Sequence, residues 1–329
     1  MQRREFLTTT AAAALLTSSD SSAATQSDRR TQRSIPKIDT HQHLWDLSRF
    51  QPPWLSGAPP VLAQSYVTSD YISATRGLDI VRTVYMEVDV AVADQNREAA
   101  HVIELSRSEA HPTCAGIISG RPNSEAFEAY IRQHADSKHI RGVRQVLHVD
   151  GTERGHCLEP QFVKSVQLLG TLGRTFDLCM RPTELNDAAG LAELCPETTL
   201  ILDHCGNADP RAFVPDSAEE PWHTVDEWKR GLAAFAGHDN AYCKISGIVA
   251  RAPQGWNCDH LAPIVEFCLE TFGFDRVVFG SDWPVCLLGG PLASWVAALN
   301  EVIAERPATE RRKLYHDNAV RVYGLDALV

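Results

Sequence analysis

The strongest constraint on this 329-residue chain is a regular alternation of short apolar, β-rich runs with longer helix-like stretches. When a helix joins two consecutive strands, the strands run parallel to each other, because the helix carries the chain back to the starting edge of the sheet. Eight such units in roughly 290 residues predict a (β/α)8 TIM barrel. The expected strands are 37–43, 81–88, 114–120, 141–147, 175–180, 198–205, 241–246 and 276–283.

Helix-like segments fill most of the intervals between these strands. The alternative arrangement is a doubly wound open sheet, but no G-x-G-x-x-G follows the first strand, so the dinucleotide-binding form of that fold lacks its signature. Residues 46–70 and 206–222 are rich in proline and are expected to be long loops at the rim of the barrel. The expected helices are 94–109, 123–135, 159–171, 184–194, 223–236, 259–272, 291–305 and 308–317.

The N-terminus carries a different signal. Arg3-Arg4-Glu5-Phe6-Leu7 precedes a short apolar run, Ala11 to Leu16, and then a Ser/Ala-rich stretch. A twin arginine before such a run is typical of a bacterial Tat signal peptide, so we expect a signal at 1–24 and a periplasmic or secreted protein. Residues 25–34 are expected to form a flexible tail, and 35–329 a single domain. The apolar run is too short for stable membrane insertion.

Charge and cysteine usage exclude several classes of function. The formal net charge of -11 disfavours binding to nucleic acid, which needs a basic patch, and leaves a small molecule as the expected partner. The nine cysteines are scattered without a C-x-x-C, which argues against a zinc ribbon and a disulfide framework. We expect most of them, such as Cys179, Cys205 and Cys243, to be small core residues.

Polar residues collect where the predicted strands end. Active sites of barrels lie at the C-terminal ends of the strands, so residues at those ends should meet at one mouth. His41 and His43, two residues apart on a strand, point to the same face. The other chemically capable residues at strand ends include Glu87, Asp89, Arg144, Arg181, Asp203, His204, Lys244, Ser246 and Asp282.

This set of residues suits metal-assisted hydrolysis. Imidazole and carboxylate groups bind zinc or another divalent cation, which lowers the pKa of a bound water and polarises a carbonyl. Asp282 beside such a water can accept its proton and pass it to a leaving oxygen. Arg144 and Arg181 are candidates for holding a carboxylate. Trp45, Trp54 and Trp256 either offer a stacking surface for a sugar ring or serve packing.

Several motifs resemble a known family. The H-x-H of the first strand, "ILDHCGN" and "FGSDWPV" resemble the amidohydrolase superfamily, in its amidohydrolase-2 branch. "YMEVDVAVADQNREA", "RGVRQVL", "FDLCMRPTEL" and "KISGIV" are similar to the sugar-lactonase-like group of that branch, which includes L-fuconolactonase, L-rhamnono-lactonase and pyrone-dicarboxylate lactonase. The resemblance covers roughly residues 35 to 325.

The resemblance implies a hydrolase that opens a lactone ring, with Asp282 and His204 as catalytic residues. It implies metal ligands among His41, His43, His204, Glu87 and Asp282, and substrate contacts from Arg144, Arg181, Trp45 and Ser246. The fourth strand, RGVRQVL, has no lysine for a carbamylated two-metal centre. The expected cofactor is therefore one divalent metal, zinc first and manganese second, or none.

Two alternative functions stay open. The first is a metal-dependent decarboxylase of the same branch, in which Asp282 protonates carbon. The second is a periplasmic binding protein without catalysis. The sequence does not rank a sugar lactone over another carboxylated lactone, and it leaves the oligomeric state open.

Overall fold

The computed structural model describes residues 34–215 and 219–328. The predicted signal segment at 1–24, and the predicted tail at 25–34 except for Ser34, lie outside these residues. Ile35–Val329 forms one compact unit. In the part of the chain that is described, no helix combines the length and apolar character needed to cross a membrane.

Eight parallel strands pair in the order of the chain, β1 to β8, which confirms the predicted (β/α)8 barrel. The barrel closes between the last strand and the first. The Asp282 amide donates to the His41 carbonyl at 2.9 Å, and the His43 amide donates to the Trp283 carbonyl at 2.8 Å. The strands are β1 Lys37–Gln42, β2 Ile80–Met86, β3 Thr113–Ser119, β4 Ile140–Val146, β5 Thr175–Cys179, β6 Leu200–Leu202, β7 Ala241–Ile245 and β8 Val277–Phe279.

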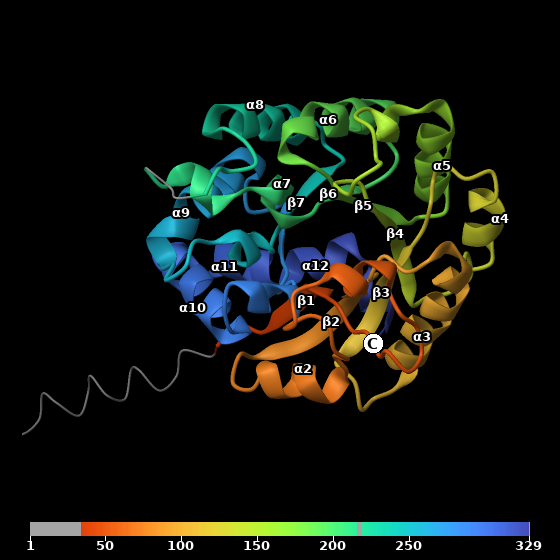
Figure 1. Ribbon diagram of the computed structural model, residues 1–329, viewed down its shortest axis with the longest axis horizontal. Helices are drawn as coiled ribbons and strands as arrows, with labels where there is room; N and C mark the ends of the chain where they lie inside the picture. Colours follow the sequence, from red (N-terminus) through yellow and green to blue (C-terminus); the bar gives the residue numbers. More distant parts are fainter. Residues whose placement is uncertain (1–33, 216–218, 329) are drawn as a thin grey trace, which may run out of the picture. The chain divides into compact units, whose positions relative to one another are not determined.

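Helices surround the strands (Figure 1). Helices α2, α7 and α12 lie outside the predicted helical segments. α2 begins inside the expected 46–70 loop, where the Asp70 carboxylate accepts a hydrogen bond from the Val67 amide at 2.9 Å and satisfies the helix start. The helices are α2 Thr68–Ala74, α3 Gln95–Arg107, α4 Phe127–Arg132, α5 Pro160–Thr171, α6 Leu185–Leu194, α7 His204–Asn207, α8 Val225–Ala236, α9 Cys258–Phe272, α10 Leu292–Val302, α11 Ala308–Arg312 and α12 Asn318–Val322.

Strand residues alternate between two apolar clusters, as the period of two requires. In β6, Leu200 and Leu202 join the large cluster beneath the helices, whereas Ile201 joins a smaller one. The smaller cluster also includes Ile38 and Val278 of other strands, together with Tyr323 near the C-terminus. The barrel interior is therefore filled by side chains and is not a pore.

A buried network of charges accompanies this interior packing. Lys244 Nζ lies 2.6 Å from Asp177 Oδ1 and 2.9 Å from Asp203 Oδ1, and all three side chains are fully buried. Burial alone lowers the pKa of Lys244, but the two carboxylates outweigh it and raise that pKa. Tyr323 donates to Asp177 Oδ1 at 3.2 Å. This network ties β5, β6 and β7 together at the level where Asp203 leaves the sheet.

Candidate active site

Two site residues stand just beyond strands that end earlier than predicted. β6 ends at Leu202 and β8 at Phe279, whereas the sequence predicted strands to 205 and 283. His204 has φ 56° and Asp282 has φ 57°, so both lie in the left-handed region that interrupts a strand. This conformation is strained for residues other than glycine, and such strain gathers at functional sites. The chain therefore turns sharply at His204 and at Asp282, where the sequence predicted extended strands.

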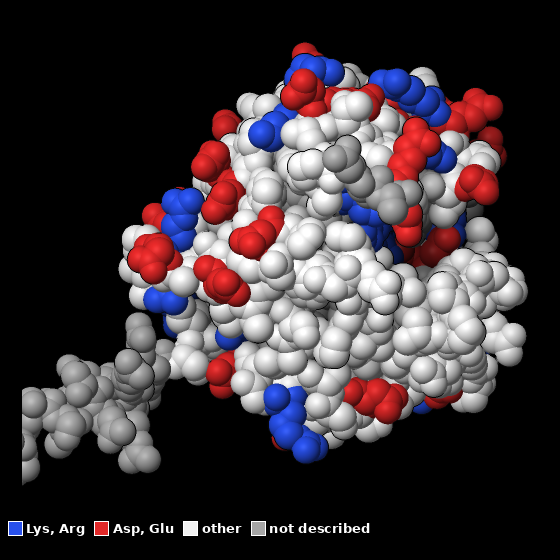
Figure 2. Space-filling view, turned by 60° about the vertical axis from the view of Figure 1, so that its left-hand side comes forward, with Lys and Arg blue, Asp and Glu red and all other residues white. Residues whose placement is uncertain are grey.

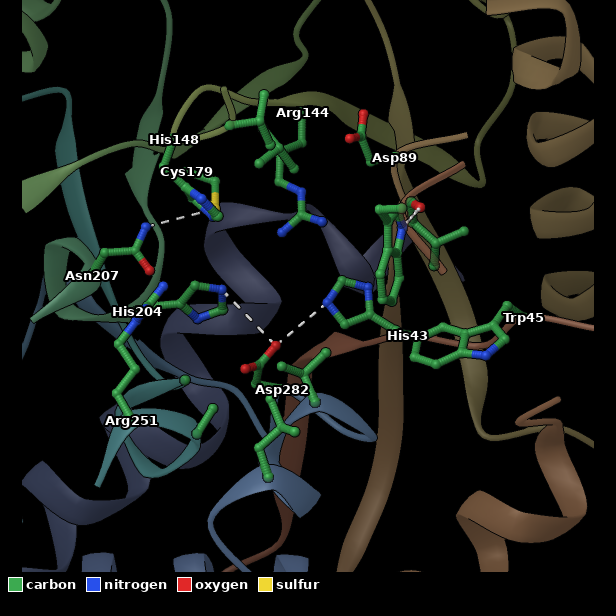
Figure 3. Close-up of a pocket in the computed structure, with 18 residues that line it drawn as sticks. His43, Trp45, Asp89, Arg144, His148, Cys179, His204, Asn207, Arg251 and Asp282 are labelled. Atoms are coloured by element: carbon green, nitrogen blue, oxygen red, sulfur yellow. Dashed lines mark hydrogen bonds and ion pairs between the residues drawn. The ribbon is translucent and has the colours of Figure 1, made fainter. Parts of the chain in front are cut away.

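Three histidines converge on the Asp282 carboxylate. His41 Nε2 and His43 Nε2 are 3.1 Å apart, and they lie 3.6 and 3.4 Å from Asp282 Oδ1. His204 Nε2 lies 3.9 Å from the same oxygen. Figure 3 shows His204 and His43 facing Asp282 from opposite sides. The sequence prediction that these four residues meet at the barrel mouth is confirmed.

Contacts at the far side of two rings orient them. His43 Nδ1 is 3.1 Å from the Met86 carbonyl, and His204 Nδ1 is 3.0 Å from Ser246 Oγ. Burial lowers the pKa of His204, and lowers that of His41 well below its usual value. Neutral imidazoles keep a lone pair for a ligand, so the rings are prepared to bind a cation or to accept a hydrogen bond.

Glu87 and Arg144 are committed to each other. Arg144 Nε donates to Glu87 Oε1 at 2.6 Å, and Nη1 reaches Asp203 Oδ2 at 3.3 Å. The second Glu87 oxygen accepts the Asp89 amide at 2.7 Å. Both Glu87 oxygens therefore already accept a hydrogen bond, and the Arg144 guanidinium already contacts two carboxylates in the structure.

Two other predicted substrate contacts also lie elsewhere. Arg181 donates to the carbonyls of Leu147 at 3.3 Å and Val149 at 2.7 Å, so it braces the loop after β4 and does not line the cavity. Ser246 is buried against His204 and is not among the residues that line the cavity. Neither residue lines the cavity, because a residue at a strand end can face the supporting shell instead of the mouth.

The aromatic predictions divide in the same way. Trp45 and Trp54 line the cavity with their rings 5.4 Å apart, and their indole nitrogens donate to backbone carbonyls. Trp256 donates to the Gly289 carbonyl at 2.7 Å and lies outside the lining. The predicted core cysteines Cys205 and Cys243 are fully buried, and Cys179 is buried at the cavity wall.

The mouth opens into a cavity of about 340 Å³, at the small end of ligand pockets. Its lining includes Asp89, His148 and Arg251, three residues to which the sequence assigned no role. They follow β2, β4 and β7, so the rule that locates barrel sites after strand ends could have assigned them to the site. On the face drawn in Figure 2, acidic and basic side chains are interspersed and Lys or Arg side chains reach into a hollow.

The donor atoms fit one divalent cation. Zinc bonds of about 2.0–2.2 Å place tetrahedral ligand atoms roughly 3.3–3.6 Å apart. The separations among His41 Nε2, His43 Nε2 and Asp282 Oδ1 are 3.1 to 3.6 Å, close to that requirement. Arg144 Nη1 lies 3.2 Å from the same His41 nitrogen, so a bound cation and this arginine would compete for one lone pair.

A family model with the description "Amidohydrolase" matches residues 38–325, nearly the whole barrel. The chain belongs to the amidohydrolase family. This amidohydrolase is accordingly a hydrolytic enzyme, and its sequence-based recognition is confirmed.

Named relatives of the amidohydrolase include lactonases. It is 27% identical to an L-fucono-1,5-lactonase of Burkholderia multivorans over 297 residues, covering 88% of this chain and 96% of the relative. It is 28% identical to an L-rhamnono-gamma-lactonase of Scheffersomyces stipitis, covering 51% of this chain and 54% of the relative. A crystal structure of a Burkholderia multivorans amidohydrolase with bound zinc shares the fold, with TM-score 0.75, 23% identity and coverage of 88% and 99%.

Proposed function

We propose that this amidohydrolase opens a lactone ring by adding water, with Asp282 as the proton carrier. One observation carries the proposal. Asp282 Oδ1 faces three histidine nitrogens, whereas Oδ2 forms no hydrogen bond with the described residues and belongs to a side chain that lines the cavity. A carboxylate held by one oxygen and open at the other is suited to accept a proton from water. The names of two lactonase relatives support the choice of ring ester as substrate class.

The reaction needs one proton to travel twice. Asp282 takes a proton from a water molecule while the oxygen of that water attacks the lactone carbonyl carbon. The ring C–O bond then breaks, and Asp282 returns the proton to the departing ring oxygen, which leaves as a hydroxyl. His204, fixed at Nδ1 by Ser246, presents Nε2 to the cavity and is placed to stabilise the carbonyl oxygen as negative charge develops on it.

We propose zinc as the metal of this site, held by His41, His43 and Asp282, with His204 beside them. Two imidazole nitrogens and a carboxylate are ligands that zinc prefers, and three protein ligands leave a position open. A bound zinc ion would lower the pKa of water and polarise the carbonyl. The solved relative that contains zinc is consistent with this choice.

The decisive experiment combines metal analysis with a lactone screen. Mature protein is purified, its metal content is measured, and L-fucono-1,5-lactone, L-rhamnono-1,4-lactone and related lactones are followed with a pH indicator, with and without chelator. We expect ring opening that falls at least about 1,000-fold in Asp282→Asn, because the base is removed while the fold is retained. Circular dichroism and the Tm of this variant confirm that it is folded. An Asp282→Asn variant with more than a few per cent of the activity would remove this residue as the base.

The same samples separate the competing functions. Release of CO₂ from aromatic or enol carboxylic acids without lactone opening would establish a decarboxylase. Tight binding of lactones without turnover by metal-loaded protein would establish a binding protein. Activity that ignores the chelator, in protein free of metal, would remove zinc from the proposal and leave Asp282 to activate water with the histidines alone.

We also propose export by the Tat route, supported by Arg3-Arg4 ahead of the short apolar run. Replacing Arg3-Arg4 with two lysines should keep the protein out of the periplasmic fraction of a bacterial host. An unchanged distribution after fractionation would contradict the proposal.

A further inference from the structure

Arg251 is a cavity-lining arginine without a carboxylate partner. It follows β7 in the short helical turn Ile248–Arg251 and lines the same cavity as Asp282. Among the residues described, no carboxylate lies within ion-pair distance of its guanidinium, and no hydrogen bond from that group is found. A mostly buried guanidinium without a close counter-charge is unfavourable: burial lowers the pKa of Arg251, and the charges of Asp209 and Asp282, both beyond ion-pair distance, oppose this shift without cancelling it. An anion in the cavity would supply that counter-charge.

An aromatic ring holds this arginine in place. The Arg251 guanidinium lies 3.3 Å from the ring centroid of Trp222, a stacking contact that leaves the edge of the guanidinium free to donate. The backbone of Trp222 is itself fixed, since its amide donates to Asp209 Oδ2 at 3.1 Å. The guanidinium is therefore pre-organised for a planar, bidentate acceptor such as a carboxylate.

The other basic groups of the cavity do not offer the same opportunity. Arg144 is engaged by Glu87 and Asp203. Burial and the charge of Arg251 lower the pKa of His148 to about 4, so its imidazole is neutral near pH 7. Arg251 is thus the one lining cation among the described residues that is free to pair with a substrate.

The opposite wall has the reverse character. Asp89 lines the cavity and accepts Arg121 Nη2 at Oδ1 at 2.7 Å, while its Oδ2 has no partner among the described residues. Figure 3 shows Asp89 and Arg251 on opposite sides of the His43, His204 and Asp282 cluster. A carboxylate oxygen that is free to accept hydrogen bonds suits substrate hydroxyls, which are donors.

We propose that the substrate is a hydroxylated lactone with a carboxylate of its own, bound with the carboxylate on Arg251 and hydroxyls toward Asp89. The reacting carbonyl then lies between them, at Asp282. This inference rests on the proposed lactonase activity and narrows it to sugar-acid lactones, as opposed to the neutral sugar lactones in the names of the curated relatives.

The test compares two lactones that differ in one charged group. Opening of D-glucaro-1,4-lactone, which carries a carboxylate, is measured against opening of neutral D-glucono-1,4-lactone. We expect the native enzyme to show the higher kcat/KM on the carboxylated lactone. Arg251→Met should lower that value about 10- to 100-fold, the usual effect of a charge-assisted hydrogen bond, and change the value for the neutral lactone less than about threefold.

Two further variants serve as controls. Arg251→Lys keeps the charge but loses the planar stacking, and should recover part of the lost kcat/KM. Arg132→Met removes an arginine from an exposed pair with Glu128 on α4 and should leave both lactones unaffected. Equal losses on both lactones in Arg251→Met, no loss on either, or a native preference for the neutral lactone would overturn the proposal.

A binding measurement separates this proposal from the proposed reaction. D-glucaro-1,4-lactone is titrated calorimetrically into Asp282→Asn, with and without Arg251→Met. Binding that disappears with Arg251 supports the anion site even where the native enzyme opens no lactone, an outcome that would reject the lactonase alone. Opening of neutral lactones with no binding or opening of the carboxylated one would reject the anion site and retain the lactonase.

Discussion

Ser246 influences the site through one hydrogen bond to a ring that lines the cavity. Its hydroxyl lies 3.0 Å from His204 Nδ1, and it does not itself line the cavity. Ser246→Ala should lower kcat about 10-fold by freeing the ring, while KM changes less than about threefold because no substrate contact is lost. Steady-state kinetics on the best lactone measure both terms. A rise in KM at constant kcat would show that Ser246 contacts substrate.

His148 links the cavity to the stability of the protein at acid pH. Its pKa of about 4 in the folded protein lies below the value of about 6.5 expected in the unfolded chain. A lowered pKa gives stability that is present above pH 6.5 and lost as the pH falls toward 4. As the pH falls over this range, the free energy of unfolding of His148→Gln should decrease by up to about 3 kcal/mol less than that of the native protein.

Urea unfolding at several pH values measures this difference. His316→Gln, which removes a surface histidine near Asp317, controls for the loss of one imidazole. Parallel pH profiles for native protein and His148→Gln would contradict the assignment.

At the residue scale, the sequence predicts which side chains meet at the barrel mouth but not which groups each arginine contacts. The meeting of His41, His43, His204 and Asp282 could be predicted because strand ends of a barrel share one mouth. The roles of arginines could not, since they depend on which carboxylates or carbonyls lie nearby after folding. Arg181 is used by loop carbonyls, whereas Arg251 is free, and nothing in their local sequence distinguishes them.

At the scale of single elements, the turn after β7 is built around a glycine. Gly247 has φ +71°, and a Cβ at this position would overlap the His204 ring at Nδ1. Gly247→Ala should therefore displace the His204 ring and reduce kcat at least about 100-fold, in addition to roughly 1 kcal/mol of backbone strain. Kinetics and urea unfolding measure the two effects.

Gly255 provides the matched control for this substitution. It has φ +75°, but a Cβ added at this residue would meet no atom within 4 Å, so Gly255→Ala carries the strain without the contact. Similar activity losses in the two variants would show that strain, and not displacement of His204, is responsible.

Strand order and most helices follow from hydrophobic periodicity, but strand ends do not. The predicted strands to 205 and 283 run on through Asp203-His204-Cys205 and Gly280-Ser281-Asp282-Trp283, which follow the last residues of β6 and β8, and the sequence alone does not mark where the strand pairing stops. The interruption comes from left-handed residues, His204 and Asp282, whose backbone is stabilised by tertiary contacts such as Asp282 to the His41 carbonyl. Helix α2 was missed because prolines dominate the sequence before it.

At the scale of the whole molecule, the barrel depends on its internal ion network. Lys244→Met leaves Asp177 buried without a counter-charge and Asp203 with Arg144 alone, which should lower the free energy of unfolding by about 3–5 kcal/mol. Lys313→Met breaks an exposed pair with Asp275 and should change it by less than about 1 kcal/mol. Urea denaturation compares the two. Equal effects would show that the network adds nothing to stability beyond an ordinary surface pair.

The site is complete only after β8 has been synthesised and has met β1. His41 and His43 leave the ribosome early, whereas Asp282 follows about 240 residues later and completes the seam between these two strands. Until then, β1 presents an unpaired edge, which is open to association with other chains. Any chain cut short before β8 therefore lacks both its last closing contacts and its proton carrier, so catalytic activity reports that synthesis and barrel closure are complete.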